Sequence, residues 1–164
     1  MEYTLNIGSG QRTFKEYPPN SGFKCINYDQ RDIEGHTDIV GDVRRLPWPD
    51  EYFSYVLASD IIEHFPISQT SLILIEWKRV LKSVDGIIEL RLPNLESICK
   101  SYINGVHDAK KTSWLLYGGQ DYPGNFHFVG FDRKWLSSIL NEHGFEVLES
   151  KDSGNNFEIK ARRL

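Results

Sequence analysis

The segment Leu5-Asn6-Ile7-Gly8-Ser9-Gly10 decides the fold, because an apolar strand-like run breaks there into a Gly-x-Gly turn. Glycines directly after a strand let the backbone turn sharply, and a ligand can approach them without meeting a Cβ atom. At the carboxyl end of the first strand of an α/β sheet, such a turn grips nucleotide-like cofactors. The third glycine of a dinucleotide fingerprint is missing, since position 13 is Thr13. The turn alone therefore predicts a nucleotide-like ligand without naming it.

Beyond this turn, strand-like and helix-like apolar runs alternate along the chain, which is typical of βαβ units and a mainly parallel sheet. Strands are predicted at residues 3–7, 25–29, 37–40, 54–59, 86–92, 145–150 and 156–163. Helices are predicted at residues 68–82, 95–104 and 132–143. We therefore expect a single α/β domain over residues 1–164, folded as a Rossmann-like three-layer sandwich.

Two of the predicted helices carry clear local signals. The helix 68–82 has Ser68 as its expected N-cap, and its apolar face consists of Ile73, Trp77, Val80, Leu81 and Val84. The helix 132–143 is opened by Asp132 and closed by Gly144, and its apolar face consists of Trp135, Leu136, Ile139 and Leu140. Both faces predict packing against the sheet.

Two segments lack a regular pattern. Residues 11–24 contain Pro18-Pro19-Asn20-Ser21-Gly22 and leave room for two helical turns at most, so the first crossover helix is expected to be shortened. Residues 105–131 are rich in glycine and aromatic residues. A long irregular segment of this kind favours a cover on the substrate side of the site over a simple spacer.

The composition excludes several classes of function. With 19 Lys and Arg against 23 Asp and Glu, the chain is mildly acidic, which argues against nucleic acid as a partner. No apolar run approaches the length needed to span a bilayer, and the N-terminus resembles no secretion signal. Cys25 and Cys99 stand far apart and outside any metal-ligand spacing, so the sequence predicts no metal site and a cytoplasmic protein with reduced thiols.

Polar residues follow the first four predicted strands. Gly8 and Gly10 follow the first strand, and Asp29 ends the second. Asp29 comes about 20 residues after the glycines, which is the offset expected for a carboxylate that accepts from ribose hydroxyls. Asp42 follows the third strand, and Ser59-Asp60 follows the fourth. Because the carboxyl ends of parallel strands meet at one edge of a sheet, these residues predict a shared cofactor site.

At this point the chain resembles a known family. The run from Asp38 to Phe53, with Leu46-Pro47-Trp48-Pro49-Asp50 at its centre, looks like the third-strand segment of class I S-adenosylmethionine-dependent methyltransferases. Ser59-Asp60-Ile61-Ile62-Glu63-His64 is similar to the family's fourth strand end and its Leu-Glu-His tail. The resemblance covers nearly the whole chain and is closest to the compact type-11-like members, some of which are associated with sugar and cell-envelope pathways. It implies S-adenosyl-L-methionine as the cofactor and a seven-stranded sheet whose last strand is antiparallel.

The resemblance also implies roles for individual residues. Gly8 and Gly10 would let the backbone pass the methionine part of the cofactor, and Asp29 would accept both ribose hydroxyls. Asp42 would accept from the adenine amino group, with the Val43 backbone beside it.

On the methionine and substrate side, the resemblance places Ser59 and Asp60 along the site. Asn6 stands where the family usually has an acid that helps to hold the cofactor's ammonium group.

Two histidines are candidate bases. His64 follows the fourth strand, beside the expected methyl group, but its ring could instead bond the backbone and hold the loop before Pro66. His127 lies in the expected cover, where it could reach a substrate hydroxyl or serve packing. A general base is useful when the methyl acceptor is a hydroxyl.

We therefore expect a methyltransferase that acts on a small-molecule acceptor, such as a hydroxyl or carboxylate of a sugar-like or cell-envelope precursor. One alternative is a non-catalytic cofactor-binding subunit, either a homodimer or a partner of another chain. The other is an NAD-dependent oxidoreductase, which lacks its third glycine here.

Overall fold

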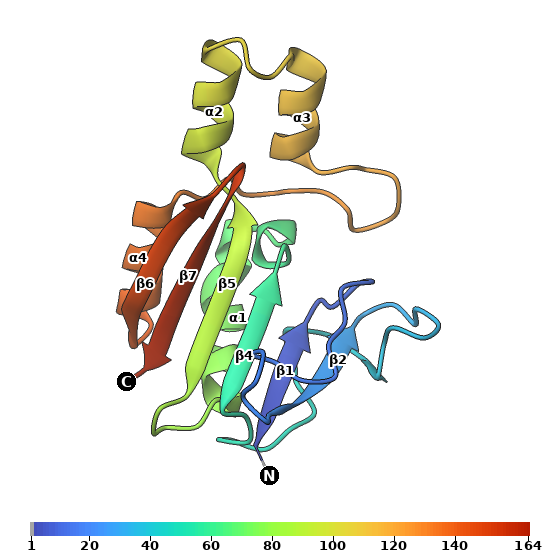
Figure 1. The fold of residues 1–164 in the computed structure, drawn as a ribbon, viewed down its shortest axis with the longest axis vertical. Coiled ribbons are helices and arrows are strands. Elements are labelled where there is room, and N and C mark those ends of the chain that lie inside the picture. The colour runs from blue at the N-terminus through green and yellow to red at the C-terminus, as the bar shows by residue number, and fades with distance from the viewer. Residues whose placement is uncertain (1) are drawn as a thin grey trace.

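The computed structural model describes residues 2–164, which form one seven-stranded sheet (Figure 1). The strands are β1 (Tyr3–Ile7), β2 (Lys24–Asp29), β3 (Ile39–Val40), β4 (Tyr55–Ser59), β5 (Ile87–Pro93), β6 (Phe145–Ser153) and β7 (Asn156–Arg163). Their order across the sheet is β3-β2-β1-β4-β5-β7-β6. Strands β1 to β5 pair in parallel, while β7 is antiparallel to both of its neighbours. The predicted sheet, including its antiparallel last strand, is confirmed.

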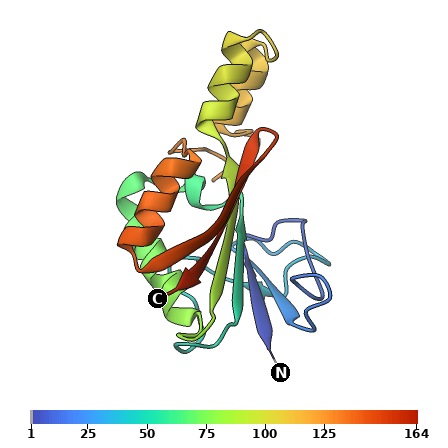
Figure 2. The same ribbon diagram turned by 60° about the vertical axis from the view of Figure 1, so that its left-hand side comes forward.

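The helices lie mainly on one side of this sheet. They are the 3₁₀ helix η1 (Ile62–His64) and the α-helices α1 (Ile67–Val80), α2 (Leu95–Ile103), α3 (Ala109–Tyr117) and α4 (Arg133–Glu142). Figure 2 shows α1 and α4 on the same face of the sheet, whereas α2 and α3 form a hairpin that projects beyond the end of β5. Among the described residues, no helix combines the length and the apolar character required to cross a membrane.

The face under α1 and α4 is an apolar core. Residues that alternate along the strands point toward it and are fully or almost fully buried: Leu5, Ile7, Val56, Ala58, Ile88, Leu90, Phe157 and Ile159. From the helices, Ile73 and Trp77 of α1 and Leu136 and Leu140 of α4 pack against them. Apolar residues at a 3.6-residue period line one face of each helix, and apolar residues at a two-residue period line one face of each strand. The two apolar faces pack against each other and form the core.

The opposite face is polar. Thr4, Asn6, Asn27, Tyr55 and Glu89 point toward it and are buried under the chain between β1 and β2. That chain contains no helix, which confirms the shortened crossover, so the predicted third layer of the sandwich is formed here by loop (Figure 2). A loop offers hydrogen-bonding backbone groups where a helix would offer apolar side chains, and the strands carry matching polar residues.

Several local predictions were wrong. Helix α1 begins at Ile67 after Pro66, so Ser68 is not the N-cap. Because the helix ends at Val80, Val84 lies beyond the apolar face and is 74% exposed. Trp135 of α4 is also largely exposed, since its position lies at the edge of the buried stripe formed by Leu136 and Leu140.

Helix α3 was missed altogether, because it lies within the segment 105–131 that the sequence predicts to be irregular. The local signal existed: Asp108 caps the helix by accepting from the Lys111 N–H, and Gly118 ends it with a φ of +80°. Glycine is favoured at such a C-terminal position. Neither signal was used, because the glycine and aromatic residues of 105–131 are typical of an irregular segment.

Candidate cofactor and acceptor site

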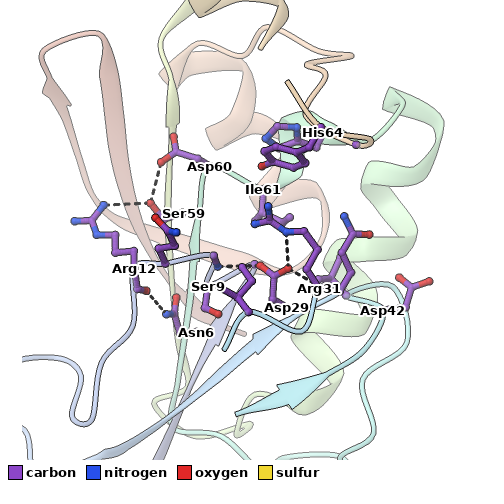
Figure 3. Close-up of a pocket in the computed structure, with 18 of the residues that line it drawn as sticks. Asn6, Ser9, Arg12, Asp29, Arg31, Asp42, Ser59, Asp60, Ile61 and His64 are labelled. Atoms are coloured by element: carbon purple, nitrogen blue, oxygen red, sulfur yellow. Dashed lines mark hydrogen bonds and ion pairs between the residues drawn. The ribbon is translucent and has the colours of Figure 1, made fainter. Parts of the chain in front are cut away.

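A cavity of about 840 Å³ opens at the carboxyl ends of β1, β2 and β4. All eight predicted cofactor residues line it: Asn6, Gly8, Gly10, Asp29, Asp42, Val43, Ser59 and Asp60. His64 lines it too, and Figure 3 shows its ring on the opposite side of the cavity from Asp29 and Asn6. The residues arrive there because parallel strands end at one edge of the sheet, on either side of the point where strand order reverses at β1.

The turn after β1 is held by its neighbouring strand. The N–H groups of Gly8 and Ser9 both donate to the carbonyl of Tyr28, at 2.8 and 3.1 Å. Gly8 adopts a φ of +66°, and a Cβ atom there would come within 2.8 Å of the Ile61 side chain. Glycine is therefore required at position 8 both by conformation and by space.

Asp29 connects the ends of β1 and β2. Its carboxylate is buried and accepts from the Gly10 N–H at 2.8 Å. It also accepts from the backbone N–H of Arg31 at 2.9 Å and from Arg31 Nε at 3.3 Å. The Arg31 guanidinium in turn lies over the Tyr122 ring, 4.4 Å from its centre. Asp29 therefore stands at the floor of the cavity, and Arg31 extends from it to the loop 118–131 above.

Asp42 is the more exposed of the two strand-end carboxylates in the cavity, with 47% of its side chain accessible against 6% for Asp29. Its carboxylate forms a bidentate pair with Arg44, with Nε–Oδ1 and Nη2–Oδ2 distances of 2.9 and 2.7 Å. These hydrogen bonds lower the pKa of Asp42, so the carboxylate stays ionised. The neighbouring Val43 is buried, and its carbonyl accepts from the indole N–H of Trp77 at 3.0 Å. This bond fixes the backbone beside Asp42 to the core.

Asn6 lines the cavity and also hydrogen-bonds to the loop between β1 and β2. Its amide nitrogen donates to the carbonyl of Arg12 at 2.8 Å and to Oδ1 of Asn27 at 3.0 Å. Asn27 itself exchanges two hydrogen bonds with the backbone of Phe14. The two amides therefore hold the loop over the polar face, a role that a carboxylate at position 6 could not fill because it has no N–H to donate.

The end of β4 is strained. Asp60 adopts a φ of +54°, which is uncommon for a residue other than glycine. Its N–H donates to the carbonyl of Arg91 at 2.7 Å, and one carboxylate oxygen accepts from Asn156 Nδ2 at 3.0 Å. Ser59 donates to the other carboxylate oxygen at 3.2 Å. Strain of this kind persists where the surroundings impose it, and it is concentrated at functional sites.

The two candidate bases lie together, although only His64 borders the cavity. The rings of His64 and His127 are 4.8 Å apart and nearly perpendicular. Nδ1 of His64 is 2.9 Å from the carbonyl of Phe126, and Nδ1 of His127 is 3.2 Å from the carbonyl of Leu115. Because a carbonyl oxygen only accepts, both Nδ1 atoms carry the proton, and both Nε2 atoms keep a lone pair. Burial lowers the pKa of each ring, which favours this neutral form.

Glu63 stands beside these histidines and was missed by the sequence reasoning. Its side chain is 1% exposed, and neither carboxylate oxygen has a hydrogen-bond partner within the described structure. Burial raises the pKa of Glu63 well above its usual range. One ligand atom from each of Glu63, His64 and His127 lies within 4.8 Å of the others. The sequence spacing could not predict this cluster, because His127 comes from a loop 63 residues away from His64.

Arg31 and Arg44 are further cavity residues that the sequence reasoning did not single out. A signal existed in their spacing, since each follows a predicted site carboxylate by two residues. Tyr122 belongs to the aromatic residues of 105–131, which the sequence allows either to stack on an acceptor or to pack in the core. Within the expected cover 105–131, the structure brings Asp121, Tyr122 and Gly124 to the cavity, whereas α3 packs beside α2.

Comparison with known proteins identifies the family of the chain. A family model described as a methyltransferase domain matches residues 5–88, just over half of the chain. A search of curated protein sequences finds no match.

Solved structures match over almost the entire chain. The PH0226 protein of Pyrococcus horikoshii OT3 is 18% identical, with a TM-score of 0.72, and the match covers 99% of this chain and 82% of that one. A S-adenosylmethionine-dependent methyltransferase from Archaeoglobus fulgidus is 19% identical, with a TM-score of 0.67, and 99% and 86% of the two chains are covered. The Burkholderia thailandensis 1,6-didemethyltoxoflavin-N1-methyltransferase, with bound 1,6-didemethyltoxoflavin and S-adenosylhomocysteine, is 14% identical, with a TM-score of 0.69 and coverages of 98% and 70%.

The sheet order and the cavity at its carboxyl edge define a Rossmann-like α/β protein of the class I methyltransferase type. The family match is more specific than the fold, and it favours methyl transfer over the dehydrogenase alternative. The chain belongs to the methyltransferase domain family.

Proposed function

We propose that the chain binds S-adenosylmethionine in the cavity and transfers its methyl group to a small-molecule acceptor in the cytoplasm. The observation that carries this proposal is the convergence of all eight predicted cofactor residues on one cavity. Four separate segments supply them, so chance proximity along the chain does not explain the arrangement. The volume of about 840 Å³ is within the range of small-molecule sites and would accommodate a cofactor together with a small acceptor.

Asp29 would accept from the ribose hydroxyls of the cofactor. An ionised carboxylate offers about four lone-pair positions, of which the Gly10 N–H occupies one on Oδ2 and Arg31 occupies two on Oδ1. One position on Oδ2 thus remains for a first hydroxyl. A second hydroxyl would replace Arg31 Nε, whose 3.3 Å contact is the longest of the three.

Asp42 and Val43 would hold the adenine end, and Asn6, Gly8 and Gly10 would face the methionine part. Arg44 keeps Asp42 ionised and already makes four contacts with its carboxylate oxygens. An exocyclic amino group would therefore replace the longest of them, Arg44 Nε to Oδ2 at 3.1 Å.

The acceptor would lie between Ser59-Asp60 and His64. In the transfer, an acceptor oxygen forms a bond to the methyl carbon while the carbon–sulfur bond breaks, and that bonding pair stays on sulfur as a neutral thioether. In the ion-free protein the acceptor's proton would pass to Nε2 of His64, which keeps its lone pair because Nδ1 donates to Phe126. His127, against the His64 ring, would hold that ring in place or contact the acceptor.

These groups favour an acceptor hydroxyl or carboxylate, as in a sugar-like or cell-envelope precursor. Since a sulfonium is already activated, positioning would supply most of the rate, about 7–11 kcal/mol of the barrier. A general base would add about 10²–10⁴-fold for a hydroxyl.

A second candidate is a cofactor-binding subunit that does not catalyse transfer itself. It is favoured by the Asn6 amide nitrogen, which donates to the loop carbonyl of Arg12 and to Asn27. One solved structural neighbour is a putative methyltransferase from Haloferax volcanii in complex with the Trm112 methyltransferase activator. A homodimer or a partner chain that completes the acceptor side would fit the same role.

Calorimetric titration with S-adenosylhomocysteine tests the proposal. We expect binding to the wild type and a loss of about 10–100-fold in affinity for Asp29→Ala, because the variant loses hydrogen bonds between the cofactor and a charged group. The matched control is Asp32→Ala, because Asp32 is exposed and lies outside the cavity. Absence of binding at millimolar ligand, or binding of NAD in its place, would overturn the proposal.

A further inference from the structure

The cluster of Glu63, His64 and His127 has more unused bonding capacity than a structural role requires. Both oxygens of Glu63 are buried without a partner, which is costly for a carboxyl group in either protonation state. Each histidine spends its Nδ1 proton on a backbone carbonyl and keeps Nε2 free. The structure therefore gathers one buried carboxylate and two imidazoles, all with lone pairs to donate.

We propose that Glu63, His64 and His127 bind a divalent first-row transition-metal ion, such as Zn²⁺, at the edge of the cavity. Two imidazole nitrogens and one carboxylate oxygen form a borderline donor set that suits such ions, whereas Mg²⁺ and Ca²⁺ prefer oxygen ligands alone. An ion there supplies the positive charge that the buried Glu63 carboxylate lacks.

The surroundings of the two histidines match those of metal ligands. Ligating histidines usually donate their second ring N–H to a carbonyl or carboxylate, which fixes the tautomer and the orientation of the ring. The carbonyls of Phe126 and Leu115 do this for His64 and His127.

The geometry requires the cluster to contract on uptake of the ion. The three ligand atoms lie within 4.8 Å of one another. Ligands at about 2.1 Å from a tetrahedral ion lie about 3.4 Å apart. Side-chain rotation can supply this change. The η1 backbone is tied to the loop by the Phe128 N–H, which donates to the Glu63 carbonyl at 2.8 Å, so the elements that carry the ligands are already joined.

Three protein ligands leave at least one coordination position open. Because His64 lines the cavity, we expect that position to face the acceptor side. Binding of the ion does not depend on methyl transfer, whereas a role of the ion in that reaction rests on the proposed function. With the ion bound, an acceptor hydroxyl on the open position would lose its proton to solvent because the ion lowers its pKa. Proton acceptance by His64 then belongs to the ion-free protein only.

Metal titration of the untagged full chain, after treatment with a chelator, tests this site directly. We expect Co²⁺ to bind with one ion per chain, to give visible d–d absorption, and to be displaced by Zn²⁺. Zn²⁺ should also raise the melting temperature, and the chelator should reverse the rise. A wild-type protein that binds neither ion would overturn the inference.

Variants identify the ligands. Glu63→Gln and His127→Ala should each weaken Co²⁺ binding by at least about 100-fold, since loss of an outer-shell partner alone costs about 10–100-fold. His107→Ala is the matched control and should bind as the wild type, because His107 lies outside both the cluster and the cavity. Circular dichroism checks that each variant folds. His64→Ala is a third ligand variant, in η1, whereas His127 lies in the loop 118–131. It should weaken Co²⁺ binding to the same extent. Unchanged affinity in these folded variants would overturn the assignment.

Titration with S-adenosylhomocysteine, in the ion-free and the Zn²⁺-loaded protein, separates the two proposals. Binding of S-adenosylhomocysteine without binding of Co²⁺ or Zn²⁺ overturns the ion site and leaves the proposed function in place. Binding of the ion without S-adenosylhomocysteine supports the ion site and contradicts the proposed function.

Discussion

The two faces of the sheet are buried by different means. On one face, Leu5, Val56 and Ile88 pack against α1 and α4 in an apolar core. On the other, Asn6 and Glu89 hydrogen-bond to a loop and to neighbouring side chains. The same strands supply both faces through alternate residues. Loss of a crossover helix therefore changes the chemistry of the sheet face that the helix would have covered, because a loop brings polar backbone groups that need hydrogen-bond partners.

The polar face also has a hydrogen-bond network centred on Glu89 of β5, which the loop reaches through Tyr17. Glu89 is buried and accepts from the hydroxyls of Tyr17, at 3.0 Å, and Tyr55. Burial is the main cause that raises the pKa of both tyrosines, and the Glu89 charge adds to it. Lys160 stands opposite Glu89 on β7, with a 3.8 Å Nζ–Oε2 distance. Such a network is stable only while every member has its partner.

The largest effect is expected on the apolar face. Trp77→Ala removes a fully buried indole that also donates to the Val43 carbonyl. We expect a loss of about 3–5 kcal/mol in the free energy of unfolding, because a cavity remains in the core. Urea denaturation measures it. The control is Trp114→Ala, at a site that is 54% exposed, where a change within about 0.5 kcal/mol is expected. Equal losses in both variants would mean that the core does not dominate stability.

A smaller loss is expected on the polar face. Glu89→Ala leaves the Tyr17 and Tyr55 hydroxyls without their acceptor, which should cost about 2–3 kcal/mol in urea denaturation. The triple variant Tyr17→Phe, Tyr55→Phe, Glu89→Leu removes the three hydrogen-bonded members of the network and leaves only Lys160, whose side chain is 38% exposed. This variant should recover to within about 1 kcal/mol of the wild type. If the triple variant is less stable than Glu89→Ala, then this face requires its network and cannot be made apolar.

Glu146→Ala serves as the control for Glu89→Ala. Glu146 pairs with Arg162 at the surface, where both side chains are more than 40% exposed. A change of less than about 1 kcal/mol is expected for such a pair.

Asn6→Asp tests how the loop is held. The substitution replaces the amide that donates to Arg12 and Asn27 with a carboxylate, which would face two acceptor oxygens. We expect a loss of about 1–2 kcal/mol and faster proteolysis within residues 11–23. Asn104→Asp, at an exposed position after α2, should change neither quantity. Stability equal to the wild type would contradict the structural role of the Asn6 amide.

The smallest effect concerns thiol reactivity. Cys25 is 4% exposed on the polar face, and burial raises its pKa to about 12. At pH 8 its reactive thiolate is therefore a minute fraction. We expect a thiol reagent to label only Cys99 in the native protein and both cysteines in urea. In the Cys99→Ser variant the native protein should remain unlabelled. Rapid labelling of that variant would show that the loop leaves the polar face open.

Much of the fold followed from local patterns in the sequence. The strand β4 and the helix α1 were predictable because their apolar periods are strong. Boundaries were less certain: Pro66, not Ser68, precedes α1, since proline fixes a φ suited to the start of a helix. Helix α3 was obscured because the aromatic and glycine content around it is typical of loops.

The convergence of the proposed cofactor residues on one cavity was predictable for a simple physical reason. Gly8, Asp29 and Asp42 each follow a strand, and parallel strands bring their carboxyl ends to one edge. The side of the cavity that the loop 118–131 covers was less accessible to prediction. Arg31 and Tyr122 come from segments that share no periodicity, and their contact exists only once the loop 118–131 has folded back.

The sequence by itself determined the sheet, the polar strand ends and the family of this protein, because those features depend on residues close together in the chain. Only the tertiary structure decided which groups from distant segments meet. It buried Glu63 without a partner among the described residues, and it placed His127 against His64. Burial and long-range contact depend on the packing of the whole chain, and no local pattern encodes them.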